Sequence, residues 1–135
     1  MTTLLDASAA IAWCMPDEFD ASAEALLTHV ANEGAIVPAL WAYEVENALR
    51  NAHRRSRLTV ADALATMTRL RALPIRVVDA GDGVVFRDAF TLAVDHAISV
   101  YDAVYLDTAR RHGASIASRD ERLLKIAETL GIPRF

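Results

Sequence analysis

Short apolar segments alternate with longer amphipathic segments along the whole chain. Each short segment is only three or four residues long and is separated from the next by helical periodicity, a pattern typical of a parallel sheet covered by helices on both faces. The predicted strands are 3–5, 35–37, 75–78 and 115–117. The predicted helices are 7–14, 20–33, 40–55, 60–72, 82–96, 99–113 and 120–130.

One acid interrupts this pattern. In the helix that begins at Ser99, Asp102 falls within the apolar stripe, where a carboxylate is costly unless it caps, pairs or binds a cation. Asp107 is predicted to point away from the stripe, toward solvent and two arginines three and four residues on. Asp102 therefore has no ordinary surface explanation. The stripe consists of Tyr105, Leu106 and Ala109, and the arginines are Arg110 and Arg111.

Three further acids are placed to join Asp102. Asp6 directly follows the first strand, Asp120 comes shortly after the last strand, and Glu44 lies early in the helix that follows the second strand. Ligands of parallel sheets bind beyond the carboxyl ends of the strands. The four acids are therefore candidates for one rim of the domain.

Each of these acids also has a simpler explanation. Asp6 or Asp120 could cap the helix that follows it. Ser118 and Glu121 have the spacing of a capping box, which favours Ser118 as the cap and would leave Asp120 free. Glu44 could be an ordinary surface acid. Spacing alone leaves both interpretations open.

The helix that carries Glu44 has a polar flank beside its apolar stripe. This flank runs from Glu44 through two amides to a pair of arginines, which fits either a path from a metal site to bound phosphates or a solvated edge. The stripe is Trp41, Val45, Ala48, Leu49 and Ala52, and the flank is Glu44, Asn47, Asn51, Arg54 and Arg55.

Bulk composition limits the class of protein. The chain has 135 residues, which predicts a single domain spanning 1–135, and its net charge of −4 argues against general nucleic-acid binding. Cys14 is the only cysteine, the N-terminus lacks the basic start of a signal peptide, and no apolar run approaches the roughly 20 residues of a membrane span. These features predict a cytoplasmic domain with no membrane segment.

Four short motifs together resemble the PIN-domain ribonucleases, and specifically the VapC toxins of type II toxin–antitoxin pairs. They occur in the family's order and cover nearly the whole length. The motifs are Leu5-Asp6-Ala7-Ser8, Glu44-Val45-Glu46-Asn47-Ala48-Leu49, Tyr101-Asp102-Ala103-Val104-Tyr105-Leu106 and Ser118-Arg119-Asp120-Glu121-Arg122-Leu123.

The resemblance implies a fold, a site and an activity. The expected fold is a three-layer α/β/α PIN-like domain with a short parallel sheet of about five strands. The expected activity is endonucleolytic cleavage of single-stranded or loop RNA by metal-activated water, with Mg²⁺ or Mn²⁺ as cofactor. The implied metal ligands and catalytic residues are Asp6, Glu44, Asp102 and Asp120, supported by Ser8, Asn47 and Ser118.

The resemblance also implies a partner, a cognate VapB-like antitoxin. The hydrophobic fraction of 53% further predicts exposed apolar surface for that partner or for a second copy of the chain in a homodimer. Arg54 and Arg55 are candidate contacts for RNA phosphates. Clustered carboxylates suit hard divalent cations, and a metal-activated water needs no serine, cysteine or histidine nucleophile.

Three alternatives use similar residues. A phospho-acceptor receiver domain would be expected to have a lysine after a late strand, yet the only lysine, Lys125, lies within the last helix. A haloacid-dehalogenase-type phosphatase would have a second aspartate where Ser8 stands. The third alternative is a PIN-fold binding module that keeps the antitoxin partner and lacks nuclease activity, and the sequence leaves it open.

Overall fold

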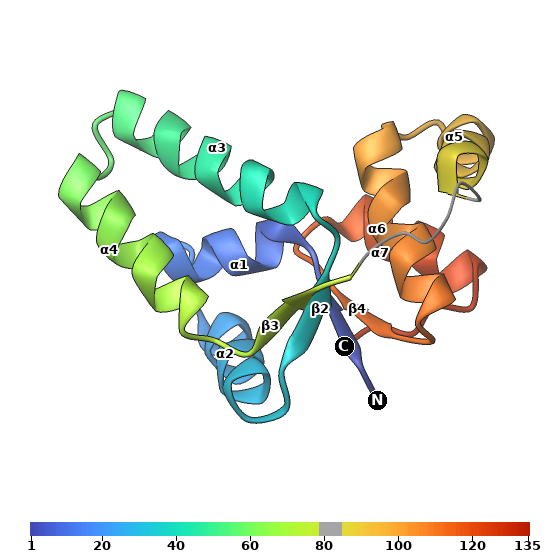
Figure 1. The fold of residues 1–135 in the computed structure, drawn as a ribbon, viewed down its shortest axis with the longest axis horizontal. Coiled ribbons are helices and arrows are strands. Elements are labelled where there is room, and N and C mark those ends of the chain that lie inside the picture. Colours follow the sequence, from blue (N-terminus) through green and yellow to red (C-terminus); the bar gives the residue numbers. More distant parts are fainter. Residues whose placement is uncertain (79–84) are drawn as a thin grey trace.

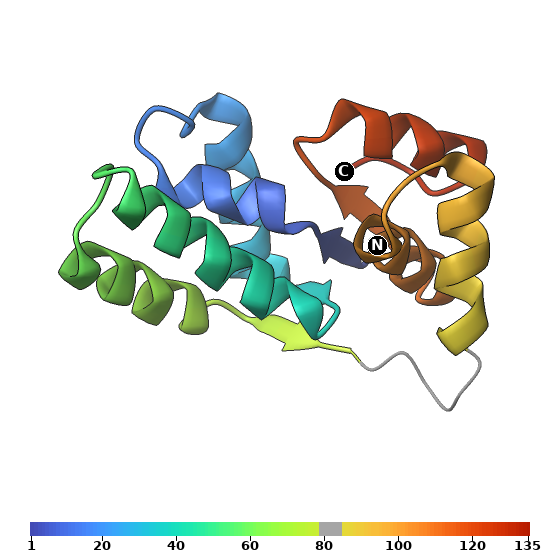
Figure 2. The same cartoon turned by 90° about the horizontal axis from the view of Figure 1, so that it is seen from above.

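The computed structural model describes residues 1–78 and 85–135, except for the side chains of residues 85 and 86. Within these residues, four strands form one parallel sheet in the order β3-β2-β1-β4. This is the predicted α/β class, and Figures 1 and 2 show the sheet between two groups of helices. The strands are β1 (Thr3–Leu5), β2 (Ala35–Val37), β3 (Ile75–Val77) and β4 (Ser115–Ala117).

The helices also follow the predicted pattern to within a few residues at their ends. Helices α1 to α4 lie on one side of the strands in Figure 2, and α5 to α7 lie on the other. The expected start of the fifth helix at Asp82 lies outside the described residues. The helices are α1 (Ala7–Cys14), α2 (Ala21–Glu33), α3 (Leu40–Arg54), α4 (Val60–Arg71), α5 (Val85–His96), α6 (Val100–Arg111) and α7 (Glu121–Thr129).

Local sequence signals explain where several helices begin and end. Asp20 caps α2 by accepting from the Ala23 N–H, and Thr59 and Asp62 form a complete capping box at the start of α4. Gly34 ends α2 with a φ of 80°, which a side chain would disfavour, and an added Cβ would lie 2.9 Å from the Pro74 carbonyl oxygen.

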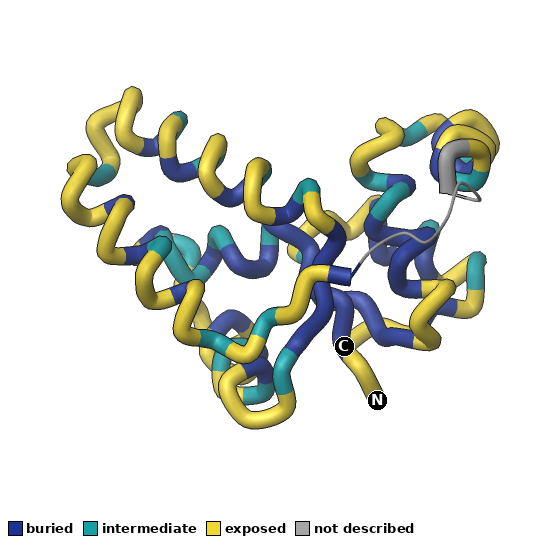
Figure 3. Tube along the Cα trace, in the orientation of Figure 1, coloured by how far each residue is buried: buried dark blue, intermediate teal, exposed yellow. Residues whose placement is uncertain are grey.

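The three strands β1, β2 and β4 are buried along their whole length, while β3 is a partly exposed edge (Figure 3). The other edge, at β4, is covered by the C-terminal segment. Ile116 donates its N–H to the Pro133 carbonyl at 2.9 Å, and its carbonyl accepts from the Phe135 N–H at 3.0 Å. This parallel bridge to Arg134 adds a fifth extended segment beside the four strands.

The prediction that Asp107 of α6 points toward solvent is wrong. Its side chain is only 3% exposed, because α5 packs against the side of α6 that the periodicity assigns to solvent. Its expected partners are present: Arg111 Nε lies 2.7 Å from Oδ2 and Arg110 Nη2 lies 3.3 Å from Oδ1. Arg111 also contacts Asp88 at 3.1 Å and so connects α6 to α5. The carboxylate of Asp107 is therefore buried between its two arginine partners, and Arg111 links it to α5.

The order of the strands locates the place where a ligand would bind. From β1 the chain moves outward to β2 and β3, and later returns to place β4 on the opposite side of β1. Beyond the carboxyl ends of β1 and β4 the following segments therefore diverge, and parallel sheets bind ligands at such switch points. In the described part of the chain, no helix is both long and apolar enough to cross a membrane.

Candidate active site

Asp6 lies at the switch point, directly after β1. Its backbone N–H continues the sheet by donating to the Ala117 carbonyl at 2.9 Å, and the residue is only 6% exposed. Although Asp6 stands at the N-cap position of α1, its side chain makes no capping hydrogen bond. Instead Oδ2 accepts from the hydroxyls of Ser118 at 2.6 Å and Ser8 at 2.7 Å.

Burial raises the pKa of the Asp6 carboxyl. The hydrogen bonds from Ser118 and Ser8 oppose that shift, and the charge of Asp120 adds to it. The two serines thus hold a partly desolvated carboxylate in one orientation. They come from α1 and from the segment after β4, and their own oxygens lie 3.3 Å apart.

Asp120 is the N-cap of α7. Its Oδ1 accepts from the backbone N–H groups of Arg122 at 3.0 Å and Leu123 at 3.2 Å, so the expectation that Ser118 caps this helix and leaves Asp120 free is wrong. Ser118 instead accepts from the Asp120 N–H at 3.0 Å while donating to Asp6. The physical reason is that the Ser118 hydroxyl lies against Asp6 and Ser8, just beyond the end of β1. The cap role does not remove the charge of Asp120 from the neighbourhood of Asp6.

Glu44 reaches this region from α3. Its Oε2 accepts a 3.0 Å hydrogen bond from the hydroxyl of Tyr105, a fully buried residue of α6. Burial raises the pKa of the half-buried Glu44, the hydrogen bond from Tyr105 lowers it, and the charges of Asp6 and Asp102 raise it further. Burial and the nearby carboxylate of Glu44 raise the pKa of Tyr105, so its hydroxyl stays a donor.

Asp102 occupies the first turn of α6 and is half-buried, less deeply than its place in the apolar stripe suggests. Its backbone N–H is capped by the Ser99 hydroxyl at 3.1 Å. Burial raises the pKa of its carboxyl, and so do the charges of Asp6 and Asp120. Asp6, Glu44 and Asp102 therefore each respond to the charge of at least one other predicted acid. We call Asp6, Glu44, Asp102 and Asp120 the acidic cluster.

The donor set of the acidic cluster fits a hydrated hard cation. Among the described residues, no three Asp, Glu, His or Cys side chains are close enough together to hold an ion directly. Mg²⁺, however, usually takes one or two carboxylates and keeps water and substrate phosphate as its other ligands. Carboxyl groups that repel one another and have raised pKa values gain from a shared cation.

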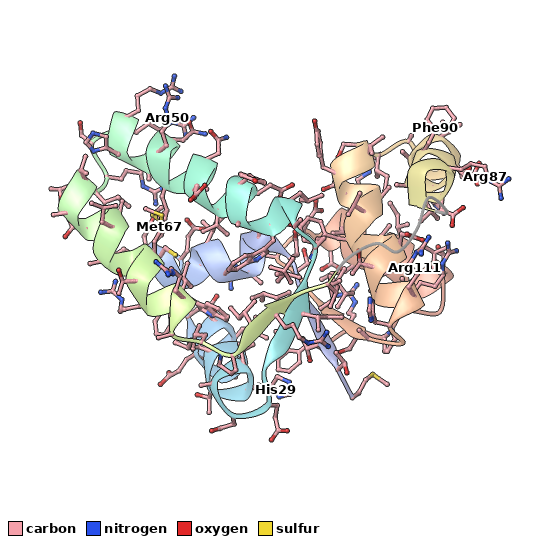
Figure 4. All side chains as sticks on the ribbon, viewed as in Figure 1. His29, Arg50, Met67, Arg87, Phe90 and Arg111 are labelled. Atoms are coloured by element: carbon pink, nitrogen blue, oxygen red, sulfur yellow. The ribbon has the colours of Figure 1, made fainter. Side chains whose placement is uncertain are left out.

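The remaining predicted residues lie along α3, from one turn beyond Glu44 to the C-terminal end of the helix. Asn47 is exposed, and its side chain makes no hydrogen bond within the described residues. Arg54 and Arg55, at the end of α3, are exposed and form no ion pair in the described part of the chain. At 1.5 Å per residue they lie about 15 Å along the helix from Glu44. Arg50 marks this outer end of α3 in Figure 4.

Sequence reasoning missed the contact between Tyr105 and Glu44. The available signal was the position of Tyr105 in an apolar stripe, because a buried tyrosine hydroxyl needs a partner. Of the predicted core stripe of α3, Ala48 is only half-buried, while Trp41, Val45, Leu49 and Ala52 are buried. The half-buried position of Ala48 shows that the side of α3 next to Glu44 lies at the edge of the core.

Comparison with known proteins identifies the family to which the chain belongs. The family described as "PIN domain" matches residues 3–129. The curated protein "Ribonuclease VapC3" of Pyrobaculum aerophilum is 31% identical over 137 aligned residues, which cover 98% of this chain and 100% of that protein.

Two solved structures share the fold. "PAE2754" from Pyrobaculum aerophilum superposes with a TM-score of 0.73 at 24% identity, covering 96% of this chain and 92% of that one. "FitAcB" from Neisseria gonorrhoeae superposes with a TM-score of 0.68 at 18% identity, covering 99% and 96%. The resemblance seen in the four motifs is thereby confirmed: this chain belongs to the PIN-domain family and is similar to its VapC-type members.

Proposed function

We propose that this chain is a metal-dependent endoribonuclease and the toxin of a type II toxin–antitoxin pair. The observation that supports the proposal is that Asp6, which directly follows β1, and the carboxyl groups of Glu44 and Asp102 each respond to the charge of another predicted acid. The similarity to a protein named as a ribonuclease supports the same activity. The expected place of action is the cytoplasm, where RNA is available.

In this proposal the acidic cluster would hold Mg²⁺ or Mn²⁺, mainly through Asp6 and Asp102. When bound, the ion lowers the pKa of a coordinated water and offsets the charge of the scissile phosphate. Ser8 and Ser118 keep the Asp6 carboxylate oriented, and Tyr105 does the same for Glu44. Asp120 contributes charge while it caps α7. No side-chain nucleophile is needed.

The polar flank of α3 would bind the RNA backbone. Arg54 and Arg55 offer charged forks that suit phosphate oxygens, and the exposed amide of Asn47 lies between them and Glu44. A strand lying along α3 would contact these arginines while its scissile phosphate is at the acidic cluster.

A cleavage assay tests this function directly. The purified chain is incubated with short single-stranded and hairpin RNAs in Mg²⁺, in Mn²⁺ and in EDTA. Endonucleolytic products that require the metal and disappear in Asp102→Asn are expected. Stable RNA in every buffer, despite a folded protein, would favour the binding module without nuclease activity.

We also propose a cognate VapB-like antitoxin and a second copy of the chain as partners. A protein tail that enters an acidic cluster should present a cation, most effectively an arginine, which binds carboxylate through two hydrogen bonds. The antitoxin is expected to be encoded by the neighbouring gene. Replacing such an arginine in it by alanine should abolish inhibition of the nuclease. Full inhibition by the alanine variant would show that bulk coverage suffices. Sedimentation of the isolated chain tests the homodimer.

A further inference from the structure

Two large aromatic side chains stand exposed immediately beside the acidic cluster. Tyr43, which precedes Glu44, is 71% exposed, and Tyr101, which precedes Asp102, is 65% exposed. Neither side chain makes a hydrogen bond or ring contact in the described part of the chain. Isolated exposed apolar residues are ordinary in soluble proteins. These two differ because both flank proposed metal ligands, on the two helices joined by Tyr105 and Glu44.

The direction of Tyr101 follows from the contact made by Tyr105. The Tyr105 hydroxyl crosses from α6 to Glu44 on α3, so this side of α6 is directed toward α3. Tyr101 is four residues earlier and therefore lies one turn above Tyr105 on the same side of the helix. Its exposed ring thus stands at the outer edge of the acidic cluster, above the buried Tyr105.

Tyr43 occupies the corresponding edge on α3. At 100° per residue it shares an exposed strip with Asn47 and Arg54, on the side of the helix opposite the core stripe, and Glu44 lies between that strip and the core. The strip therefore leads from the ring of Tyr43, beside the acids, to the arginine at the outer end of α3.

The negative charge of the acidic cluster makes uncharged contacts important for binding RNA beside it. The chain has a net charge of −4, and its acidic cluster repels phosphates until a cation is bound. Arg54 and Arg55 lie about 15 Å from Glu44 along the helix. Stacking of bases on aromatic rings supplies affinity that does not depend on neutralising the acids.

We propose that Tyr43 and Tyr101 are stacking platforms for unpaired bases on either side of the phosphate at the acidic cluster. This inference rests on the proposed ribonuclease function and assigns its preference for single-stranded RNA to these two rings. In a duplex the bases already stack on one another and cannot also stack on a protein ring. Every base has a π-face, so the two rings distinguish single strands from duplexes and do not read the base sequence.

The experiment measures RNA binding in EDTA, where the strand is not cut. The probes are a fluorescent single-stranded RNA and the same strand annealed to its complement. The variants are Tyr43→Leu and Tyr101→Leu, with Tyr43→Phe and Tyr101→Phe as ring-preserving controls. Phe90→Leu is a matched control, because Phe90 is 62% exposed on α5, on the outside of the molecule (Figure 4).

Each leucine variant is expected to weaken single-strand binding about tenfold, while the phenylalanine variants and Phe90→Leu bind like the wild type. Duplex binding should be weak and unchanged. A strand carrying 2-aminopurine should lose fluorescence on binding the wild type and the phenylalanine variants, and keep it with the leucine variants.

Three results would overturn the inference while the ribonuclease function stands. The leucine variants could bind single strands as well as the wild type, they could lose single-strand and duplex binding equally, or they could alter self-association and leave RNA affinity unchanged. A wild-type chain that neither binds nor cuts RNA would instead remove the proposed function and the inference together.

Discussion

The hydroxyl of Tyr105 on α6 donates a 3.0 Å hydrogen bond to Oε2 of Glu44 on α3, and this bond joins the two groups of helices beyond the end of the sheet. Tyr105 is fully buried, whereas Glu44 is only half-buried. The tyrosine is therefore the fixed partner, and it determines where the glutamate carboxylate lies.

Tyr105→Phe should leave the ring packed and release Glu44. Loss of a hydrogen bond to a half-buried carboxylate costs about 1–2 kcal/mol, so we expect nuclease activity to fall about tenfold and half-saturation by Mn²⁺ to need more metal. Melting temperature, kcat and metal midpoint are measured together. Thr68→Val, which removes an exposed hydroxyl on α4, is the control. An unchanged metal midpoint in Tyr105→Phe would contradict a positioning role.

Asp6→Asn and Asp102→Asn should each abolish RNA cleavage and growth inhibition while the fold survives. Both carboxylates lie in the acidic cluster, and an amide binds a hard cation more weakly than a carboxylate does. Asp95→Asn, at an exposed acid on α5, should cut RNA at the wild-type rate. Circular dichroism verifies folding. Wild-type activity in Asp102→Asn would remove this residue from the site.

Asp107→Asn should behave differently from both. Because Asp107 is buried with Arg110 and Arg111 as partners, the amide should destabilise the fold by about 1–3 kcal/mol and lower the melting temperature. Activity per folded molecule should stay near that of the wild type. Urea unfolding gives the first quantity and cleavage well below the melting temperature gives the second. A variant that is fully stable would contradict the internal ion pairs.

The acidic cluster should also make metal-free stability depend on pH. Burial and mutual repulsion raise the carboxyl pKa values of Asp6, Glu44 and Asp102 in the folded state. The folded chain therefore holds these protons more tightly than the unfolded chain. The stability that protonation provides is complete below the ordinary carboxyl values near 4 and is lost as the pH rises through the raised folded values.

It follows that Asp102→Asn should melt slightly above the wild type at pH 7 without metal, and that this advantage should shrink as the pH falls toward 4. Millimolar Mg²⁺ or Mn²⁺ should raise the wild-type melting temperature, because the ion binds the folded state. Thermal melts with and without EDTA measure both effects. A melting temperature that does not change on addition of metal would contradict a metal site at the acidic cluster.

The sequence predicted the elements well because their signals are local. Short apolar runs defined β1, β2 and β4, and the capping residues Asp20 and Thr59 marked helix starts. The acidic cluster was found because Asp102 broke a helical pattern. The burial of Asp107 was missed, since the periodicity of one helix does not reveal that α5 packs on its other side. The cap at Asp120 and the bond from Tyr105 depend on long-range geometry, which spacing within a single segment cannot supply.

The last prediction concerns the arginines at the end of α3. Arg54 and Arg55 form no ion pair among the described residues, whereas nearby Arg57 contacts Asp17 at 2.8 Å and Glu18 at 3.7 Å. The charge of Arg57 is thus already balanced, while the other two are available to phosphates. Removing one phosphate contact to a single strand should reduce the slope of log affinity against log salt by about 0.7.

Arg54→Gln and Arg55→Gln should therefore each weaken RNA binding at low salt, flatten the salt dependence by that amount and raise KM with little change in kcat. Arg57→Gln is the control from the same segment, and it should lose a surface ion pair and leave the slope unchanged. Affinities are measured by anisotropy over a series of salt concentrations. A slope that falls equally in all three variants would mean that the effect is one of general charge and that α3 has no defined path for the RNA backbone.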